Sequence, residues 1–260
     1  MAQLDAFSLE GRVALIPGGA GAIGSAMAAA LAGAGARVAI ADRTCRMCDD
    51  VVARVQQAGS EGLGIGADVT IEADCDRMVA ETIERFGRID ILVNAVGGGA
   101  GKVLHPAEAY PRADWDWIME LNVRSTLLAT QSAARAMIEA GHGGSILNIS
   151  SVRANLGINA GYSAYVAAKG AISSLTRQWA TEWAKYGIRV NAIMPTFVDT
   201  PQVASLLADP AFKAGVVSRI PLGRVGETGD LVGAAIFLVS DASSFVTGSA
   251  LFVDGGWTAQ

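Results

Sequence analysis

Charged residues and cysteines are both scarce in this chain of 260 residues. Only 17% of the residues are charged, and the net charge of −5 comes with no basic block, so we expect neither nucleic acid nor an anionic membrane as a partner. Three cysteines, an odd number, do not form a disulfide framework, and they fit a reducing, cytoplasmic compartment. At 51%, the hydrophobic residues exclude a disordered chain and suffice for one large core.

Long, strongly apolar runs are also missing, and residues 13–36 come nearest to one. This stretch is uncharged and long enough to span a bilayer, but it contains Pro17, six glycines and few strongly apolar side chains. The residues before it include Asp5 and Glu10 and lack the basic start of a signal peptide. We therefore expect a soluble, unprocessed chain with no membrane partner.

Residues that bind metals are few. Cys45 and Cys48 form a C-x-x-C pair, an arrangement that can be redox-active or bind zinc. A zinc site would need two more ligands, and the remaining candidates, Cys75, His105 and His142, lack the spacing of a metal site. We therefore interpret the pair as two thiols in the first turn of a helix, and we expect no metal.

Short β-like runs alternate with longer helical runs from end to end. The predicted strands are 12–16, 37–41, 62–66, 89–94, 145–149, 188–193 and 250–253, and the predicted helices are a first one that ends near Leu31, then 51–57, 71–86, 114–140 with Asp114 as its cap, 162–185 and 229–239. This alternation indicates a single α/β domain over residues 1–260, a doubly wound parallel sheet with helices on both faces. Residues 195–221 hold four of the seven prolines, and we expect an irregular excursion that closes over a substrate as a lid.

A glycine pattern marks the turn after the first predicted strand. Gly19, Gly21 and Gly24 satisfy G-x-G-x-x-G directly after a strand and at the start of a helix, where backbone N–H groups can approach the pyrophosphate of a dinucleotide. Asp42 lies at the end of the second strand, where a carboxylate would accept hydrogen bonds from ribose hydroxyls and repel a 2′-phosphate. The pattern predicts NAD rather than NADP, although Arg43 could weaken that preference. A turn without a ligand is the alternative.

Tyr165 and Lys169 are four residues apart on a predicted helix and therefore share one face. A free phenol has a pKa near ~10, too high for an efficient base at neutral pH. An ammonium about 4 Å away, at an effective dielectric constant of ~20, is worth up to ~4 kcal/mol and would bring the pKa of Tyr165 near ~7. The pair is thus a candidate for moving a proton between an alcohol and a carbonyl. The alternative is a surface tyrosine and lysine at helical spacing.

Five motifs follow one another in an order that covers nearly the whole chain. Residues 17–24 read P-G-G-A-G-A-I-G, 92–97 read L-V-N-A-V-G, 165–169 read Y-V-A-A-K, 191–195 read N-A-I-M-P and 253–256 read V-D-G-G. In this set and order the chain resembles the short-chain dehydrogenase/reductase family, with its loop T-G-x-x-x-G-x-G, its stretch N-N-A-G and its pair Y-x-x-x-K. Pro17, Ala22, Ala95 and Thr196 depart from the family pattern and bear on cofactor affinity more than on reaction class.

The resemblance implies a Rossmann-like fold and hydride transfer between NAD and a secondary alcohol or its ketone. It makes Tyr165 the acid–base group, and Lys169 the residue that lowers its pKa and holds the ribose. Ser151 would orient the substrate oxygen, with Ser150 as the alternative, and Asn122 would hold a water that links Lys169 to solvent. The cofactor-binding residues that it implies are Gly18, Gly21, Ala22, Ile23, Gly24, Asp42, Arg43, Asp68, Val69, Asn94, Tyr165, Lys169, Val198 and Thr200.

Two cations stand near the predicted substrate site. Arg153 follows Ser151 by two residues, and Lys102 adjoins the glycine loop 97–101, so together they could bind a carboxylate, sulfonate or phosphate. The alternative is that both are solvated loop charges. The run 150–169 also resembles sugar-acid and polyol dehydrogenases of the family, especially gluconate 5-dehydrogenase-like members.

The sequence therefore predicts an NAD-dependent enzyme that transfers a hydride between nicotinamide and a secondary alcohol or its ketone, in a polyol, sugar or sugar acid. As family members usually do, it would form a homotetramer, or else a homodimer, with the helices 114–140 and 162–185 as contacts. An NADPH-dependent reductase of a hydrophobic or carrier-bound ketone is the first alternative, which Asp42 disfavours. A non-catalytic NAD-binding sensor is the second, which the intact set of Ser151, Tyr165 and Lys169 disfavours.

Overall fold

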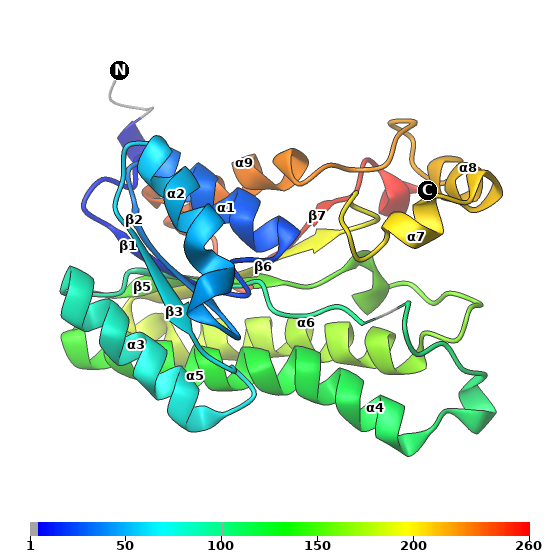
Figure 1. The fold of residues 1–260 in the computed structure, drawn as a ribbon, viewed down its shortest axis with the longest axis horizontal. Helices are drawn as coiled ribbons and strands as arrows, with labels where there is room; N and C mark the ends of the chain where they lie inside the picture. The colour runs from blue at the N-terminus through cyan, green and yellow to red at the C-terminus, as the bar shows by residue number, and fades with distance from the viewer. Residues whose placement is uncertain (1–4, 100) are drawn as a thin grey trace.

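The computed structural model describes residues 5–99 and 101–260 and contains one parallel sheet of seven strands (Figure 1). The strand order is β3-β2-β1-β4-β5-β6-β7. Their bounds are Val13–Pro17 for β1, Arg37–Asp42 for β2, Gly62–Gly66 for β3, Ile91–Asn94 for β4, Gly144–Ile149 for β5, Ile188–Pro195 for β6 and Ala250–Val253 for β7. The order reverses direction between β1 and β4, which confirms the predicted doubly wound α/β fold.

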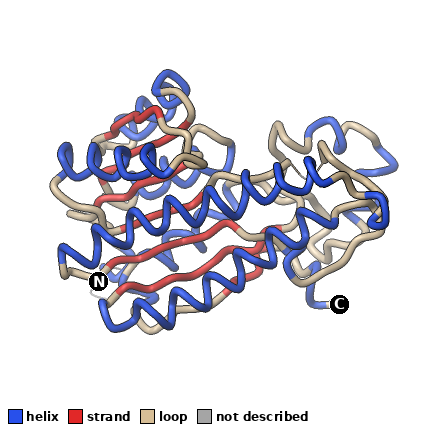
Figure 2. The backbone as a smooth tube through the Cα atoms, turned by 90° about the horizontal axis from the view of Figure 1, so that it is seen from below, coloured by secondary structure: helices blue, strands red, loops and turns tan. Residues whose placement is uncertain are grey.

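Helices cover both faces of the sheet (Figure 1). One face carries α1 (Ala22–Gly33), α2 (Asp49–Gln57) and α9 (Gly229–Val239), and the other carries α3 (Glu72–Phe86), α5 (Ser125–Ala140) and α6 (Ser163–Trp183). The helix α4 (Arg112–Met119) leads into α5, while α7 (Ala204–Leu207) and α8 (Pro210–Val217) lie close to the C-terminus. Figure 2 shows the long helices running beside the strands, with the longest loops gathered at the end where the C-terminus lies.

The central strands β1 and β4 are buried along their whole length, and apolar residues fit them because helices cover both faces. In β1, Ala14 and Ile16 belong to the core under α1, α2 and α9, whereas Val13 and Leu15 belong to the core under α3, α5 and α6. All five residues of β1 are buried. The central strand thereby holds the two layers of helices together, and its carboxyl end fixes where the glycine loop begins.

Three local predictions need correction. Asp114 does not cap a helix: Pro111 holds the cap position with extended backbone, and the Asp114 carboxylate lies 2.7 Å from Nε2 of His105. The predicted helix 114–140 is interrupted by a π-helical turn, Glu120–Arg124. The excursion 195–221 is not wholly irregular, since it contains α7 and α8.

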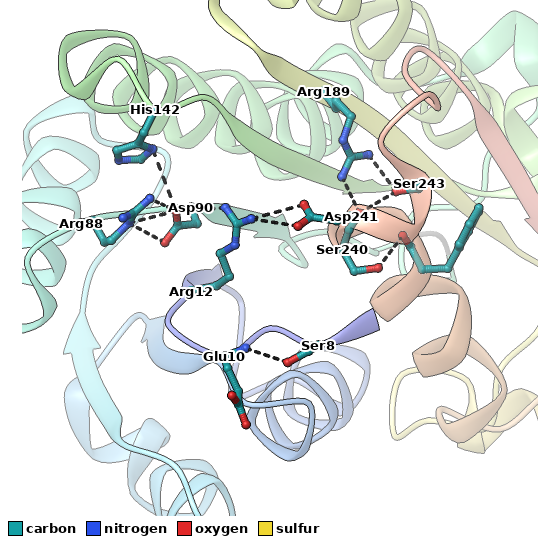
Figure 3. A network of polar contacts seen from close by, with 11 residues as sticks. Ser8, Glu10, Arg12, Arg88, Asp90, His142, Arg189, Ser240, Asp241 and Ser243 are labelled. Carbon is teal, nitrogen blue, oxygen red and sulfur yellow. Dashed lines mark hydrogen bonds and ion pairs between the residues drawn. The ribbon is translucent and has the colours of Figure 1, made fainter. Parts of the chain in front are cut away.

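A buried carboxylate fixes the amino ends of the central strands, away from the glycine loop (Figure 3). Asp90, whose side chain is 2% exposed, accepts a hydrogen bond of 2.9 Å from the backbone N–H of Val13 and two more from Nε of Arg88. Nη1 of Arg12 and Nδ1 of His142 lie 3.7 and 3.9 Å from it. Asp90 thus ties the start of β1 to the start of β4.

Candidate active site

The turn after β1 packs so closely that glycine is required at two positions. Gly18 has φ +73°, and a Cβ there would lie 2.7 Å from the backbone nitrogen of Val96. A Cβ at Gly24 would collide with the carbonyl oxygen of Gly18 and lie 2.8 Å from Cα of Gly19. The loop therefore folds tightly between the ends of β1 and β4, as the glycine pattern predicts.

The first turn of α1 leaves backbone N–H groups exposed to a ligand at this loop. Gly21 holds the cap position, so no capping side chain accepts the N–H groups of the first turn. That turn also contains no acidic residue. The N–H groups of Ala22, Ile23 and Gly24 precede the first N–H that bonds within the turn, that of Ser25 to the Gly21 carbonyl. Such a helix start attracts phosphate groups.

Asp42 stands beside the glycine loop at the end of β2. Its Oδ2 accepts a hydrogen bond of 3.3 Å from the backbone N–H of Ala20. Its Oδ1 accepts one of 2.9 Å from the backbone N–H of Arg43. The Arg43 side chain is exposed. Beyond the end of β3, Oδ1 of Asp68 accepts bonds from the backbone and hydroxyl of Thr70, and Val69 is buried next to it. The ends of β1, β2 and β3 thus gather the residues predicted for the adenosine half of a dinucleotide.

Asn94, which the family resemblance implies as a support of the cofactor loop, points into the interior. Its Nδ2 donates 2.8 Å hydrogen bonds to Thr130 and Asn148. The loop is instead supported by the backbone, because the N–H of Ala95 donates to the Pro17 carbonyl at 3.0 Å. Asn94 therefore orders the elements around the site.

Lys169 is buried beneath Tyr165 on α6. Its Nζ donates a 2.8 Å hydrogen bond to the Ile149 carbonyl and lies 5.7 Å from the centroid of the Tyr165 ring. Burial lowers the pKa of Lys169 to about 8 and raises the pKa of Tyr165 to about 12. The expected value near 7 is therefore wrong for this state of the site: burial of the phenol outweighs the interaction with the Ser151 hydroxyl and the charge of Arg153, which both lower the pKa of Tyr165.

The structure separates the two candidate serines. Ser151 follows β5 and caps the 3₁₀ helix Val152–Ala154, where its Oγ accepts the N–H of Arg153 at 3.2 Å and interacts with Tyr165. The Ser150 hydroxyl points into α6 instead, with bonds to the Lys169 carbonyl and the Ser173 hydroxyl. Of the two serines, Ser151 is therefore the one whose hydroxyl interacts with the Tyr165 phenol.

Asn122 lies in the π-helical turn and is fully buried. Its Nδ2 donates to the carbonyls of Ile118 and Gly98, and its Oδ1 accepts the Gly98 N–H at 2.9 Å. A Cβ at Gly97 would lie 2.7 Å from Oδ1 of Asn122 and 3.1 Å from Nζ of Lys169. The loop after β4 is thus enclosed between the amide and the ammonium, and this close approach excludes any larger residue at position 97.

Arg153 is a buried cation at the same site. Its side chain is 6% exposed, Nη1 reaches only the Gly157 carbonyl at 3.5 Å, and Nη2 has no hydrogen-bond partner in the part of the chain that the structure describes. Burial lowers the pKa of the guanidinium, while the nearby Tyr162 and Tyr165 raise it. Lys102, the other predicted cation, is exposed on its loop.

The segment after β6 completes the site. Val198 is buried and pairs with Gly226 across a short bridge, and the Thr200 carbonyl accepts the N–H of Val203. A cavity of about 230 Å³ lies beside Val198 and Thr196. A larger one of about 710 Å³ opens beside Tyr162, between the segments 104–108 and 157–163. Of the residues predicted to hold nicotinamide or substrate, Val198 lines the smaller cavity, whereas Ser151, Arg153 and Lys102 line neither.

Two aromatic and cationic neighbours of this site were missed by the sequence analysis. Trp257, in the C-terminal 3₁₀ helix Trp257–Ala259, lies under the Arg153 guanidinium, with 5.3 Å from Cζ to the ring centroid. Cζ of Arg219 lies 5.9 Å from the same ring. No local pattern could have indicated these contacts, because they join segments far apart in the sequence.

The C-x-x-C pair occupies the 3₁₀ helix Cys45–Cys48, where both thiols face the carbonyls of β3. Burial raises the pKa of Cys48 to about 11 and that of Cys75 to about 12, so both stay protonated at neutral pH. Within residues 5–99 and 101–260, no group of three or more His, Cys, Asp or Glu side chains could hold a metal ion. None of the helices among these residues is long and apolar enough to cross a membrane.

The chain is similar to known proteins over nearly its whole length. A family model described as enoyl-(acyl carrier protein) reductase matches residues 18–258. The chain is 39% identical to gluconate 5-dehydrogenase of Gluconobacter oxydans, with all of both chains covered, and 41% identical to 2-(S)-hydroxypropyl-CoM dehydrogenase 3 of Xanthobacter autotrophicus, with 96% of this chain and 98% of the relative covered. A solved structure of gluconate 5-dehydrogenase from Burkholderia cenocepacia, in complex with NADP and tartrate, is 38% identical and superposes with a TM-score of 0.91 over all of both chains.

Proposed function

Because the chain belongs to the short-chain dehydrogenase/reductase family, and is thus an oxidoreductase, we propose that it transfers a hydride between NAD and a secondary alcohol or ketone of a sugar acid. The observation that carries the substrate class is the buried guanidinium of Arg153, whose Nη2 has no hydrogen-bond partner among the described residues and whose charge lowers the pKa of the nearby Tyr165. A buried cation without a carboxylate partner is costly, and a carboxylate of the substrate would compensate it. The names of the gluconate-oxidising relatives support the same class.

The residues present fit a dinucleotide. The glycine loop folds so tightly that a Cβ at Gly18 or Gly24 would collide with neighbouring backbone, and the first N–H groups of α1 would bind the oxygens of the pyrophosphate. Asp42 would accept hydrogen bonds from the adenosine ribose, and Lys169 would hold the nicotinamide ribose. When bound, the nicotinamide supplies the hydride acceptor or donor. Val198 and Thr200 would border its amide.

The proton is moved by the side chains of the chain itself. Ser151 would hold the substrate oxygen; the phenolate of Tyr165 takes the proton of the hydroxyl during oxidation, and the resulting phenol returns it to the ketone oxygen during reduction. With a pKa of about 12, the phenol begins as an acid, and the Ser151 hydroxyl and the charge of Arg153 favour the phenolate that oxidation requires. Lys169, with Nζ 5.7 Å from the ring centroid, would add to this effect. Asn122 keeps the loop beside Lys169 in place through its bonds to Gly98.

The preference for NAD is supported by the Asp42 carboxylate, which would repel a 2′-phosphate at the end of β2. The similar structure from Burkholderia cenocepacia contains NADP, so an NADP-dependent reductase is the second candidate. Steady-state rates with both cofactors distinguish the NAD-dependent from the NADP-dependent enzyme. A kcat/KM higher with NADP than with NAD would favour the NADP-dependent reductase.

Assembly and location remain predictions from the sequence. We propose a cytoplasmic homotetramer whose contacts include α5 and α6, and we propose that the segment 195–221 closes over the substrate. Light scattering of the purified chain measures the assembly directly, and a monomer would overturn it.

The test of the substrate class compares an acid with a matched neutral polyol, gluconate against sorbitol, in the wild type and in Arg153→Gln. We expect the variant to lose about 10- to 100-fold in kcat/KM for gluconate, since a charge-assisted hydrogen bond is removed, and little for sorbitol. Lys213→Gln, an exposed lysine on α8, is the control and should change neither. Equal losses for both substrates would contradict an anionic substrate, and Lys102→Gln shows whether the exposed cation contributes.

A further inference from the structure

Trp257 stands between the sheet and the segment that follows β6. Its side chain is 7% exposed and packs with Val216 and Ile220, at the end of α8 and just after it. The ring of Phe197, which follows β6, lies 6.0 Å from it. Trp257 thereby joins the C-terminus to the segment 195–221 proposed to close over the substrate.

The C-terminal turn is held firmly in this position. The Asp254 carboxylate accepts the N–H groups of Gly256 and Thr258 at 2.9 Å each and the Thr258 hydroxyl at 2.7 Å. The Gly255 carbonyl accepts the N–H of Leu222 at 3.1 Å. The Gln260 side chain donates to the Arg219 carbonyl at 2.8 Å. Trp257 is therefore fixed relative to the segment 219–222.

Two guanidinium groups share this one ring. Cζ of Arg153 lies 5.3 Å and Cζ of Arg219 lies 5.9 Å from the ring centroid of Trp257, and each gains cation–π attraction there. The two charges repel each other, since the charge of Arg219 adds to burial in lowering the pKa of Arg153. No ion pair to a carboxylate involves either arginine among the described residues. Two arginines without a carboxylate partner in the described chain are therefore held around one indole ring.

The ring also decides where the free end of Arg153 points. The only hydrogen bond of the guanidinium head within the described chain is the long one from Nη1 to Gly157, so the indole is its main fixed neighbour. Nη2 is left without a hydrogen-bond partner in the described part of the chain, and the guanidinium is near enough to Tyr165 for its charge to lower the pKa of the phenol. Loss of the ring would free the guanidinium to rotate away from the reacting centre.

We propose that Trp257 is a positioning residue for anion selectivity: it holds the guanidinium of Arg153 toward the reacting centre and places Arg219 as a second, outer cation for the substrate carboxylate. This inference rests on the proposed function and deepens it. The C-terminal segment then sets the preference for acids over neutral polyols, and the acid–base chemistry of Tyr165 is left unchanged.

The test is a split between KM and kcat for gluconate and sorbitol in three variants. Trp257→Leu keeps an apolar side chain but removes the aromatic ring, and we expect its KM for gluconate to rise at least about tenfold, with kcat and the KM for sorbitol nearly unchanged. Trp257→Phe restores a ring and should recover much of the affinity. Arg219→Gln, at an exposed position, should raise the KM for gluconate by about two- to fivefold, and added salt should shrink this difference.

Thermal unfolding and NADH binding of each variant report whether the fold and the cofactor site are intact. A Trp257→Leu variant that affects gluconate and sorbitol equally would overturn the inference. If Trp257→Leu does not fold, the KM values of Trp257→Phe and Arg219→Gln provide the test. A KM for gluconate in Arg219→Gln that equals the wild-type value at low salt would contradict the proposal. A selective effect of Arg153→Gln without one of Trp257→Leu would sink this inference alone, whereas no selective effect of Arg153→Gln would sink the proposed function.

Discussion

Lys169 carries a positive charge into a position where its side chain is nearly sealed from water. It is 3% exposed and its Nζ donates to one backbone carbonyl, that of Ile149. Burial lowers its pKa to about 8, so the charged form is less stable there than in water. The fold nevertheless keeps a lysine at this place beside Tyr165, which fits a role in proton transfer better than a role in stability.

We therefore expect Lys169→Met to lose activity without losing stability. The pKa of Lys169 is about 8 in the folded chain and 10.5 in its reference state, so between these values the unfolded chain binds more protons. The free energy of unfolding of the wild type should then rise with pH across this window, and that of Lys169→Met should rise less. Urea unfolding at about pH 7.5 and 9.5 measures the difference. A wild type no steeper than the variant would contradict the assignment.

Asp42 makes a second prediction at the scale of one residue. In Asp42→Ala the carboxylate that would bind the ribose and repel a 2′-phosphate is gone. We expect kcat/KM to fall about tenfold or more with NAD and to rise with NADP. Asp50→Ala, an exposed carboxylate in the first turn of α2, is the control. An unchanged ratio between the two cofactors would show that Asp42 does not select them.

Among the elements, α1 matters most for the cofactor because its start is shaped by the glycine loop. In Gly24→Ala the new Cβ would collide with the backbone of Gly18, so the loop has to shift. We expect a loss of about 1–3 kcal/mol in the free energy of unfolding, as for other overpacked sites, together with weaker NADH binding. Gly33→Ala, in the last turn of the same helix, meets nothing within 4 Å and should leave both nearly unchanged. Equal effects of the two substitutions would contradict the close packing of the loop.

The strands, the glycine loop and the pair Tyr165 and Lys169 could be predicted from the sequence because each depends on a short pattern. The interior direction of Asn94, the π-helical turn at Asn122 and the pKa of Tyr165 could not, since they depend on neighbours distant in sequence. The prediction for Tyr165 counted the charge of Lys169 and left out the burial of the phenol. The contacts of Trp257 with Arg153 and Arg219 likewise need the folded chain.

At the scale of the whole molecule, residues that stabilise the fold and residues of the candidate site lie at opposite ends of the strands. The buried Asp90 network (Figure 3) lies at the amino ends of the central strands, where Asp90 accepts the N–H of Val13, and the candidate site lies at the carboxyl ends of the strands. We expect Asp90→Asn to lower the free energy of unfolding by about 1–3 kcal/mol, because the buried side chain loses the charge that accepts the Val13 N–H and the Arg88 guanidinium. The kcat of the folded fraction should stay unchanged. Asp241→Asn breaks an exposed pair with Arg12 and should cost less than about 1 kcal/mol. A loss of kcat in folded Asp90→Asn would contradict this separation.

The most direct measurement of the central claim is the formation of NADH by the wild-type chain with gluconate and with sorbitol at equal concentrations. The account predicts turnover of gluconate with kcat/KM at least about tenfold above that for sorbitol, and loss of both rates in Tyr165→Phe. Faster turnover of sorbitol, or turnover that survives in Tyr165→Phe, would contradict it.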